Sequence, residues 1–245
     1  MKLSILVVNI NNLNYTRDLI NDLFQQSCSF YLTIVDQNST EEGTTEFLNE
    51  VAKEEINVVR NCRNEPLNYL WNKFYEHCKA PYLCFLNNDI RVPRNFVIDT
   101  VNVLDQEPTV GAVIHATNHS CYDKITDLHY EILSNRYVQG WDFTIRREAY
   151  TPIPDSLKFF GGDDWLFSKL YSKNWKVACA ISSPIIHYNA SSRKYYKGDR
   201  NEENRVLREE LRVPRLSYKT PFAKRKPQFS WETIMKGESD GRGKM

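Results

Sequence analysis

Residues 82–89 read YLCFLNND, an apolar run of strand length that ends in two amides and a carboxylate. In open α/β sheets, ligands bind outside the carboxyl ends of the strands. A buried strand that carries Asn87, Asn88 and Asp89 at its tip therefore predicts a binding site. Carboxylate and amide oxygens are hard ligands that suit Mg²⁺ or Mn²⁺. The alternative for the same three residues is an Asx-turn that binds nothing.

The chain has 245 residues, 41% of them hydrophobic, and a formal net charge of +1. This composition predicts a packed core and excludes disorder throughout, while the charge favours no class of partner. None of the six cysteines forms a CxxC pair, which favours reduced, structural thiols over a disulfide framework. The apolar start at residues 3–8 is too short for a secretory leader, and no run approaches the roughly 20 apolar residues of a membrane helix. We therefore expect a cytoplasmic protein, of a bacterium or of a virus in its host, without a transmembrane segment.

Apolar runs of strand length alternate with amphipathic segments four times in the first half of the chain. This rhythm is typical of βαβ units and predicts an α/β fold with a mostly parallel, doubly wound sheet and right-handed crossovers. The expected strands are 3–10, 30–35, 56–60, 82–86 and 110–115, and the expected helices are 15–26, 44–53, 68–78 and 96–104.

The second half has a different character, with short strand candidates, helices and a basic tail. We expect strands at 137–144, 177–182 and 185–187, and helices at 146–150, 163–173 and 202–211. From residue 212 onward basic and aromatic residues alternate with prolines, and the end of the chain favours disorder. These features predict one domain over residues 1–198, with halves at 1–115 and 116–198, and an extension over 199–245 that holds a charged helix and the basic, aromatic tail.

Two further polar residues end predicted strands. Asp36 closes the second strand, where an acid in a nucleotide-binding sheet suits a hydrogen bond to a base or a ribose. A turn or helix-capping aspartate is the alternative. His187 closes a later apolar run, and for this residue a structural histidine is the alternative. The chain contains neither GxGxxG nor GxxxxGK[ST], which excludes a dinucleotide fingerprint and a P-loop.

Residues 159–165, FFGGDDW, form another candidate cluster. The two glycines permit a close approach of the backbone to a ligand. Asp163 and Asp164 are adjacent carboxylates whose charges repel, which favours proton uptake by one of them and suits a general base. Both also stand at the start of a predicted helix, where acids complement the helix dipole, so N-capping is the alternative.

Taken in order, these motifs resemble the family 2 type of GT-A glycosyltransferase from residue 3 to about residue 188. LSILVVNINN resembles the first strand and nucleotide loop of that family, VDQNSTE its VDNGSTD element, and FLNNDI its strand with the metal-binding D-x-D motif. Residues 64–72 are similar to its N-x-G-F-(x)4-N segment, residues 139–148 to its acceptor-side strand and RRE helix, and GGDDW to its E-D motif. The chain departs from the pattern at Pro66, where glycine is usual, and at Asp163, where glutamate is usual.

The resemblance implies a role for each matching residue. Asp89 and His187 would hold a divalent metal ion, Mn²⁺ or Mg²⁺, and Asp164, with Asp163 as second choice, would be the catalytic base. Donor-binding residues would be Val8, Asn9, Asn11, Asp36, Asn64, Asn72, Asn87, Asn88, Arg193 and Lys194. Acceptor-binding residues would be Gly140, Trp141, Asp142, Gly162 and Trp165.

The same resemblance implies the reaction. A sugar would move from a nucleoside-diphosphate sugar, with a UDP-sugar as the first expectation, to an acceptor hydroxyl. The usual outcome in the family is inversion at the anomeric carbon, and a carboxylate base opposite the diphosphate fits that outcome. Asn87 stands where the family often has an acid. We therefore expect metal binding at Asp89 to be weak until the diphosphate adds its negative charge.

The basic tail leaves two interpretations of the acceptor. Its Lys and Arg residues suit the phosphates of a polyanion while its aromatic residues suit stacking on bases, and such a chain resembles phage enzymes that glycosylate modified bases of their own DNA. Otherwise the tail wraps the domain, and the acceptor is a lipid-linked or surface glycan, or a protein. A catalytically silent GT-A domain that binds nucleotide or glycan is a further alternative, favoured by Asn87 and Pro66. A nucleotidyltransferase is disfavoured because NINNLNY lacks a Gly-rich phosphate loop.

Overall fold

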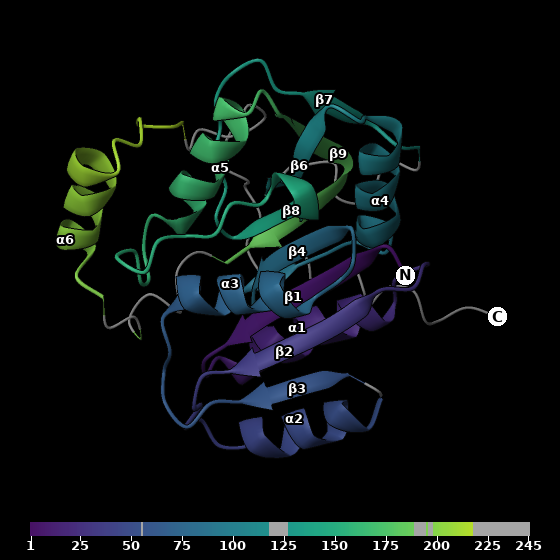
Figure 1. Cartoon of the computed structure of the whole chain (residues 1–245). Helices are drawn as coiled ribbons and strands as arrows, with labels where there is room; N and C mark the ends of the chain where they lie inside the picture. The colour runs from purple at the N-terminus through teal and green to yellow at the C-terminus, as the bar shows by residue number, and fades with distance from the viewer. Residues whose placement is uncertain (55, 118–126, 189–194, 196–197, 218–245) are drawn as a thin grey trace.

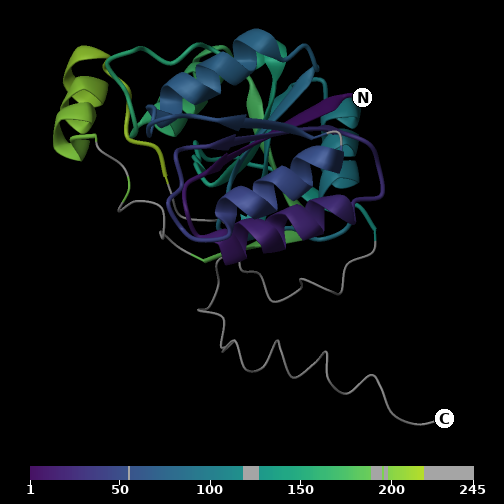
Figure 2. The same ribbon diagram turned by 90° about the horizontal axis from the view of Figure 1, so that it is seen from below.

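The computed structural model describes residues 1–54, 56–117, 127–188, 195 and 198–217 (Figure 1). Within these residues, nine strands form one sheet in the order β3-β2-β1-β4-β8-β6-β9-β5, and β7 pairs with β9 beside this path. Helices cover both faces of the sheet (Figures 1 and 2). The predicted α/β class is therefore confirmed.

The first half of the sheet is parallel. β1 (Leu3–Asn9) lies between β2 (Tyr31–Asp36) and β4 (Tyr82–Asn87), and β3 (Asn57–Arg60) pairs with the far side of β2. All four strands coincide with predicted runs. A parallel strand that is buried on both faces leaves a continuous apolar stretch in the sequence, which explains why this half could be predicted.

Alternate residues of β1 face opposite sides of the sheet, as the period of two in a strand requires. Ile5 and Val7 belong to one apolar core together with residues of α1, α2 and α4, whereas Leu6 belongs to a second core together with residues of α3 and α5. Figure 2 shows α1 and α2 on one side of the sheet and α3 on the other. Within the described ranges, no helix combines the length and the apolar character needed to cross a membrane. The helices are α1 (Leu13–Phe24), α2 (Thr44–Val51) with η1 (Ala52–Glu54), α3 (Leu67–His77), α4 (Phe96–Gln106) and α5 (Gly162–Ser172).

The second half makes the sheet mixed, because β8 runs antiparallel between β4 and β6. The strand predicted at 137–144 begins at Asp142, and one long strand, β9, replaces the two predicted at 177–182 and 185–187. Pro184 has no backbone N–H, and the ladder with β6 is interrupted between Ala180 and Ile185, but the chain stays extended. The bounds are β5 (Ile90–Arg91), β6 (Val110–Thr117), β7 (Tyr130–Ile132), β8 (Asp142–Arg146), η2 (Arg147–Ala149) and β9 (Lys176–His187).

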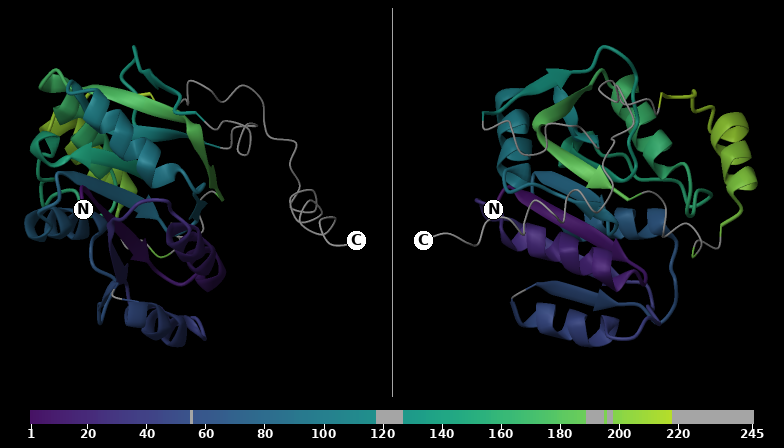
Figure 3. Two further views of the ribbon diagram at one scale, coloured as in Figure 1. Left: turned by 90° about the vertical axis from the view of Figure 1, so that its right-hand side faces the viewer. Right: turned by 180° about the vertical axis from the view of Figure 1, so that it is seen from behind.

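The chain after β9 returns to the sheet domain as α6 (Arg200–Arg205), which continues as the π-helical η4 (Val206–Glu210). The side chain of Asp199 caps α6 by accepting two backbone N–H groups. Val206 and Leu207 are buried in the core under α3 and α5. This charged helical segment therefore packs on the domain beside α5 (Figure 3). The tail from residue 218, with most of its basic and aromatic residues, lies outside the described residues.

The five cysteines that the structure describes are free thiols. Cys84 and Cys179 are buried in β4 and β9, and burial raises the pKa of both thiols above the usual range because apolar surroundings disfavour the thiolate. Both residues therefore serve as small hydrophobic side chains of the core.

Candidate active site

The predicted polar residues meet at the carboxyl ends of β1, β2 and β4. Val8 of β1 pairs with Asn87 of β4, and Asn9 of β1 pairs with Asp36 of β2. Parallel neighbouring strands end at the same edge of a sheet, so residues far apart in the sequence become neighbours there. This edge is the one that residues 82–89 predicted.

Asn9 is fully buried, and its side chain connects the three strand ends. Its Nδ2 donates to Asp36 Oδ1 at 2.7 Å, and its Oδ1 accepts from Asn88 Nδ2 at 3.0 Å and from Thr16 Oγ1 at 2.6 Å. A buried polar group left without such a partner destabilises a protein by about 1–3 kcal/mol. The three strand ends are therefore joined by a network whose members depend on one another.

The loop after β1 is bound to the loop after β2. Asn11 has a φ of 52°, a left-handed conformation that asparagine adopts more readily than most residues. Its Oδ1 accepts from the backbone N–H groups of Thr40 and Glu41 at 2.8 and 3.0 Å, and its own N–H donates to Ser39 Oγ at 2.7 Å. Asn9 and Asn11 thus shape the predicted nucleotide loop, and their contact with a donor stays a prediction.

A cleft lies beside these strand ends and is also lined by the first turns of α3. Four of the predicted donor-binding residues, Val8, Asn64, Asn87 and Asn88, line it. Gln37 also lines the cleft but was not predicted, because its only signal in the sequence is its position directly after Asp36. The other lining residues are apolar: Ile10, Leu67, Trp71, Leu86 and Phe159. A lining that combines amides with apolar and aromatic side chains suits a ligand that combines a ring with polar groups.

Two of these amides hold the loops around the cleft. Gln37 is buried, and its Nε2 donates to the backbone oxygen of Glu65 at 2.7 Å. Asn64 Nδ2 donates to the backbone oxygen of Tyr195 at 2.7 Å, so a residue beyond β9 lies against the loop after β3. Arg193 and Lys194, which were predicted to contact the donor, lie outside the described residues.

Asp89 and His187 are brought together although 97 residues separate them in the chain. His187 Nε2 lies 3.5 Å from Asp89 Oδ1, and the side chains are 10% and 2% exposed. The pairing of Ile90 with His187 between β5 and β9 creates this proximity, and the Tyr188 N–H donates to the Asp89 backbone oxygen at 3.0 Å. The His187 ring also stacks on Trp141, with centroids 5.1 Å apart.

This pair fits the predicted role in holding a divalent ion. A carboxylate oxygen and an imidazole nitrogen at this separation suit neighbouring positions around one ion. The part of the chain that the structure describes contains no group of three His, Cys, Asp or Glu side chains arranged for a metal. Two protein ligands match an ion that takes its remaining ligands from substrate phosphates and water, as Mg²⁺ commonly does.

Asp163 and Asp164 stand in the first turn of α5 but contact different parts of the protein. The Asp164 side chain is 5% exposed, and its Oδ1 accepts from Arg208 Nη2 at 2.9 Å. Asp163 lies against Gly140, where an added Cβ would come within 2.4 Å of Asp163 Oδ2. Gly140 precedes Trp141, the residue stacked on His187, so Asp163 lies on the side of α5 that faces the loop beside the Asp89–His187 pair.

The N-terminus of α5 depends on close packing. Gly161 has a φ of 70° and precedes the helix, and a Cβ on Gly162 would come within 2.1 Å of Asn68 Oδ1. These contacts explain the two glycines of GGDDW, because a larger residue would clash or be strained. A contact of Gly140 or Gly162 with an acceptor stays a prediction.

Three predicted site residues that do not line the cleft make contacts within the protein. Asn72 joins α3 to the chain after η2, since its Oδ1 accepts from the Ile153 N–H at 2.9 Å and its Nδ2 donates to Ile153 O at 2.8 Å. Asp142 is fully buried, and its Oδ2 lies 2.6 Å from His115 Nδ1. Trp165 Nε1 donates to the backbone oxygen of Pro152 at 3.1 Å.

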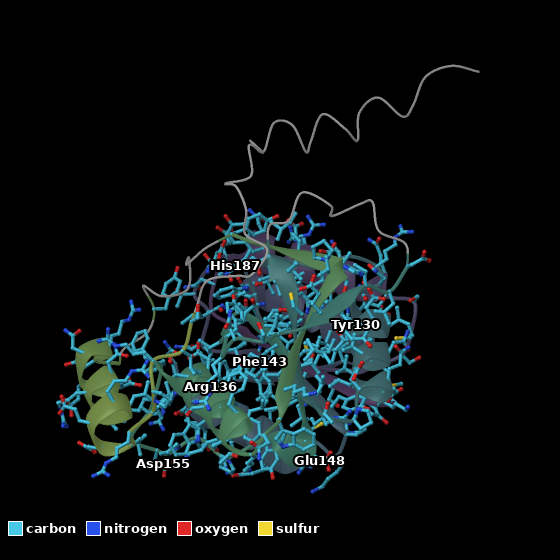
Figure 4. All side chains as sticks on the ribbon, turned by 90° about the horizontal axis from the view of Figure 1, so that it is seen from above. Tyr130, Arg136, Phe143, Glu148, Asp155 and His187 are labelled. Carbon is cyan, nitrogen blue, oxygen red and sulfur yellow. The ribbon has the colours of Figure 1, made fainter. Side chains whose placement is uncertain are left out.

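The RRE-like residues lie at the other edge of the sheet. β8 runs antiparallel to β4, and Arg146 at its end pairs with Tyr82 at the start of β4. Glu148, directly beyond β8, is consequently remote from the strand ends that carry the cleft. Figure 4 shows His187 at one edge of the molecule and Glu148 at the opposite edge.

A family model described as "Glycosyl transferase family 2" matches residues 4–173, which is more than half of the chain. The chain belongs to glycosyl transferase family 2. The resemblance inferred from the motifs is therefore confirmed at the level of the family. No curated protein sequence matches the chain.

Solved glycosyltransferase structures share the fold. GalNAc-T7 with UDP, GalNAc and Mn²⁺ matches with a TM-score of 0.66 and 15% identity, over 84% of this chain and 47% of that one. Staphylococcus aureus TarS 1-349 with UDP-GlcNAc matches with a TM-score of 0.62 and 16% identity, over 85% and 65%. The Pyrobaculum calidifontis mannosyltransferase PcManGT with GDP-Man and Mn²⁺ matches with a TM-score of 0.61 and 16% identity, over 79% of this chain and 58% of that one. This chain spans about half to two thirds of the length of these three solved chains, and 43% of the longer TarS structure. The likeness confirms the predicted GT-A fold.

Proposed function

We propose that this family 2 glycosyltransferase moves a sugar from a nucleoside-diphosphate sugar to an acceptor hydroxyl, with inversion at the anomeric carbon. The observation that carries the proposal is the Asp89–His187 pair beside a cleft lined by Asn64, Asn87 and Asn88. The cleft would take the nucleotide, and the pair would face its diphosphate. UDP or GDP in the solved structures of similar fold supports a nucleoside-diphosphate donor, and a UDP-sugar is our first choice.

Asp89 and His187 would hold a divalent ion, which supplies Lewis-acid stabilisation of the leaving diphosphate when it is bound. The Mn²⁺ in two of the solved structures supports this proposal. Asn87 is neutral, so the protein offers one carboxylate at this position. The ion should therefore bind weakly in the absence of the diphosphate.

A carboxylate at the start of α5 would take the proton of the acceptor. The acceptor oxygen forms a bond to the anomeric carbon as the bond from that carbon to the diphosphate oxygen breaks, and the hydroxyl proton passes to Asp164. Asp163 is the second choice for this role. Attack opposite the departing diphosphate produces inversion. Arg193 and Lys194 would add positive charge at the phosphates.

The donor half of this proposal is tested with the thermal midpoint of unfolding in the presence of nucleoside diphosphates, with and without Mn²⁺. A ligand that binds the folded state stabilises it by about 2.7 kcal/mol at a hundredfold excess over its Kd. We expect one nucleotide to raise the midpoint in a Mn²⁺-dependent way. D89A should abolish the Mn²⁺-dependent part and leave the unliganded midpoint near that of the wild type. Equal Mn²⁺-dependent shifts in D89A and wild type would exclude Asp89 as the anchor.

The catalytic half is tested by release of nucleoside diphosphate from the nucleotide sugar. A glycosyltransferase with an ordered site should release it slowly with water as acceptor and faster with the true acceptor. A silent GT-A domain should bind the nucleotide and release nothing. The two outcomes distinguish the main proposal from its alternative.

For the acceptor, we propose the modified bases of DNA, with a glycan as the competing class. The support is the alternation of basic and aromatic residues from residue 212, a composition suited to phosphates and stacked bases. The test is transfer of labelled sugar to base-modified DNA and to a glycan mixture. Transfer to DNA should fall steeply with rising salt, because phosphate contacts release counterions. Label in the glycan alone would exclude DNA.

A further inference from the structure

The chain beyond the family-matched residues 4–173 contacts both the loop before α5 and the first turn of α5, which carries Asp163 and Asp164 and is called the DD turn. The first contact is a buried carboxylate. Glu203 of α6 is 5% exposed, and its Oε2 accepts from three consecutive backbone N–H groups, those of Lys158, Phe159 and Phe160, at 2.7, 2.8 and 2.9 Å. Charge-assisted hydrogen bonds of this kind are stronger than neutral ones. Glu203 therefore fixes the backbone that leads into GGDDW.

Asn68 of α3 holds the same loop from the other side. Its Nδ2 donates to the backbone oxygens of Leu157 and Phe160 at 3.1 and 3.3 Å, and its backbone N–H donates to Lys158 O at 2.9 Å. Gly161 then packs on Leu207 of η4, whose Cδ2 would lie 3.0 Å from a Cβ at this glycine. The start of α5 is thus held between α3 and the C-terminal helical segment.

The second contact reaches the carboxylate proposed as the base. Arg208 of η4 donates from Nη2 to Asp164 Oδ1 at 2.9 Å. Its Nη1 donates to the backbone oxygens of Val213 and Pro214 at 3.0 and 2.7 Å. The guanidinium is therefore held in place by its own segment while it contacts Asp164. One oxygen of the Asp164 carboxylate is thus bound by a guanidinium whose other nitrogen is held by the backbone of residues 213 and 214.

We propose that α6 and η4 complete the acceptor side of the site and that Arg208 is a positioning residue for Asp164. The proposal rests on the proposed function, because it assigns a task to the partner of the proposed base. A cation held in place by its own segment binds one oxygen of the carboxylate and so aims the other oxygen. Neither residue of this pair belongs to the apolar packing of the segment, which Val206 and Leu207 supply.

The test compares R208M with R205M. Arg205 lies on α6 and pairs with Glu202 and Glu210 of the same helical segment, so its removal changes the charge equally without reaching the site. With water as acceptor, we expect R208M to lower kcat for nucleoside diphosphate release about ten- to a hundredfold, the range that misplacement of a reacting group produces. KM for the nucleotide sugar should stay within twofold. R205M should match the wild type, and R208K, which keeps the charge, should recover part of kcat.

A double-mutant cycle separates positioning from a general structural role. If Arg208 acts through Asp164, then R208M should cause no further loss of kcat in a D164N background. An equal fractional loss in both backgrounds, or wild-type kcat in R208M, would overturn the inference while leaving the proposed function intact. A wild-type protein that neither binds a nucleotide nor releases a nucleoside diphosphate would overturn both. Thermal midpoints of all variants verify that the compared proteins are folded.

Discussion

The strand-end edge, where β1, β2 and β4 carry the hydrogen-bonded Asn9, Asp36 and Asn88, and the DD turn are built in opposite ways. At the strand-end edge, Asn9, Asp36 and Asn88 come from neighbouring parallel strands or the turn after one, and they bond to one another. At the DD turn, the carboxylates of Asp164 and Glu203 are bound by a guanidinium and by backbone N–H groups. The first region lies within the first 90 residues, whereas the second combines α3, α5 and a helical segment from beyond residue 200.

The two regions should therefore respond differently to substitution. The edge is a network of buried amides in which one loss leaves several partners without hydrogen bonds. At the DD turn, separate contacts from Glu203 and Arg208 hold the start of α5. Loss of one of these contacts should therefore displace Asp164, the proposed base, more than it lowers the stability of the fold. The edge should therefore respond to mutation mainly in stability, and the turn mainly in activity.

The largest effect is expected for D164N. Loss of a general base commonly lowers turnover by about 10²–10⁴-fold. We expect a fall of that order in nucleoside diphosphate release, with nucleotide affinity within a few-fold of the wild type. D155N is the matched control, because Asp155 is an exposed carboxylate of the loop before α5. Full turnover in D164N would move the role of base to Asp163.

The next effect is expected for N9A, measured by urea unfolding. The change removes the partner of Asp36, Asn88 and Thr16 at once, and we expect a loss of about 3 kcal/mol in the free energy of unfolding. N57A, on the exposed face of β3, should leave stability unchanged. A loss in N9A no larger than in N57A would show that the network does not hold the strand ends.

The smallest effect on stability is expected for E203A, about 2 kcal/mol by the same measurement. Three hydrogen bonds to the loop before α5 are lost, but the unfavourable burial of a carboxylate is lost with them, which offsets part of the effect. E202A on the same helix, an exposed residue, is the control. Turnover should fall more in E203A than in N9A under conditions where both are folded. A larger fall of turnover in N9A than in E203A would contradict the expectation that the DD turn affects mainly activity and the strand-end edge mainly stability.

Much of the parallel half could be predicted because its information is local. A strand buried on both faces must be apolar throughout, and its polar tip stands out at residues 82–89. The strands of the second half were harder to predict from the sequence. β8 is inserted antiparallel between β4 and β6, and β9 continues past Pro184, and neither feature has a local signal. Gln37 had a weak signal in its place after Asp36, whereas Arg208 and Glu203 had none beyond a charged helix.

The alternation of strands and helices, the edge of the sheet that carries the candidate site and the family of the chain can all be read from the order of its residues. These follow from periodicity, burial and the order of short motifs, which are properties of neighbouring residues. The meeting of groups that are distant in the chain depends instead on how the elements pack in three dimensions. His187 reaches Asp89 through the pairing of β5 with β9, and Arg208 reaches Asp164 because Val206 and Leu207 bury their side chains against the core. Contacts of this kind depend on how whole elements pack, and no short stretch of sequence encodes them.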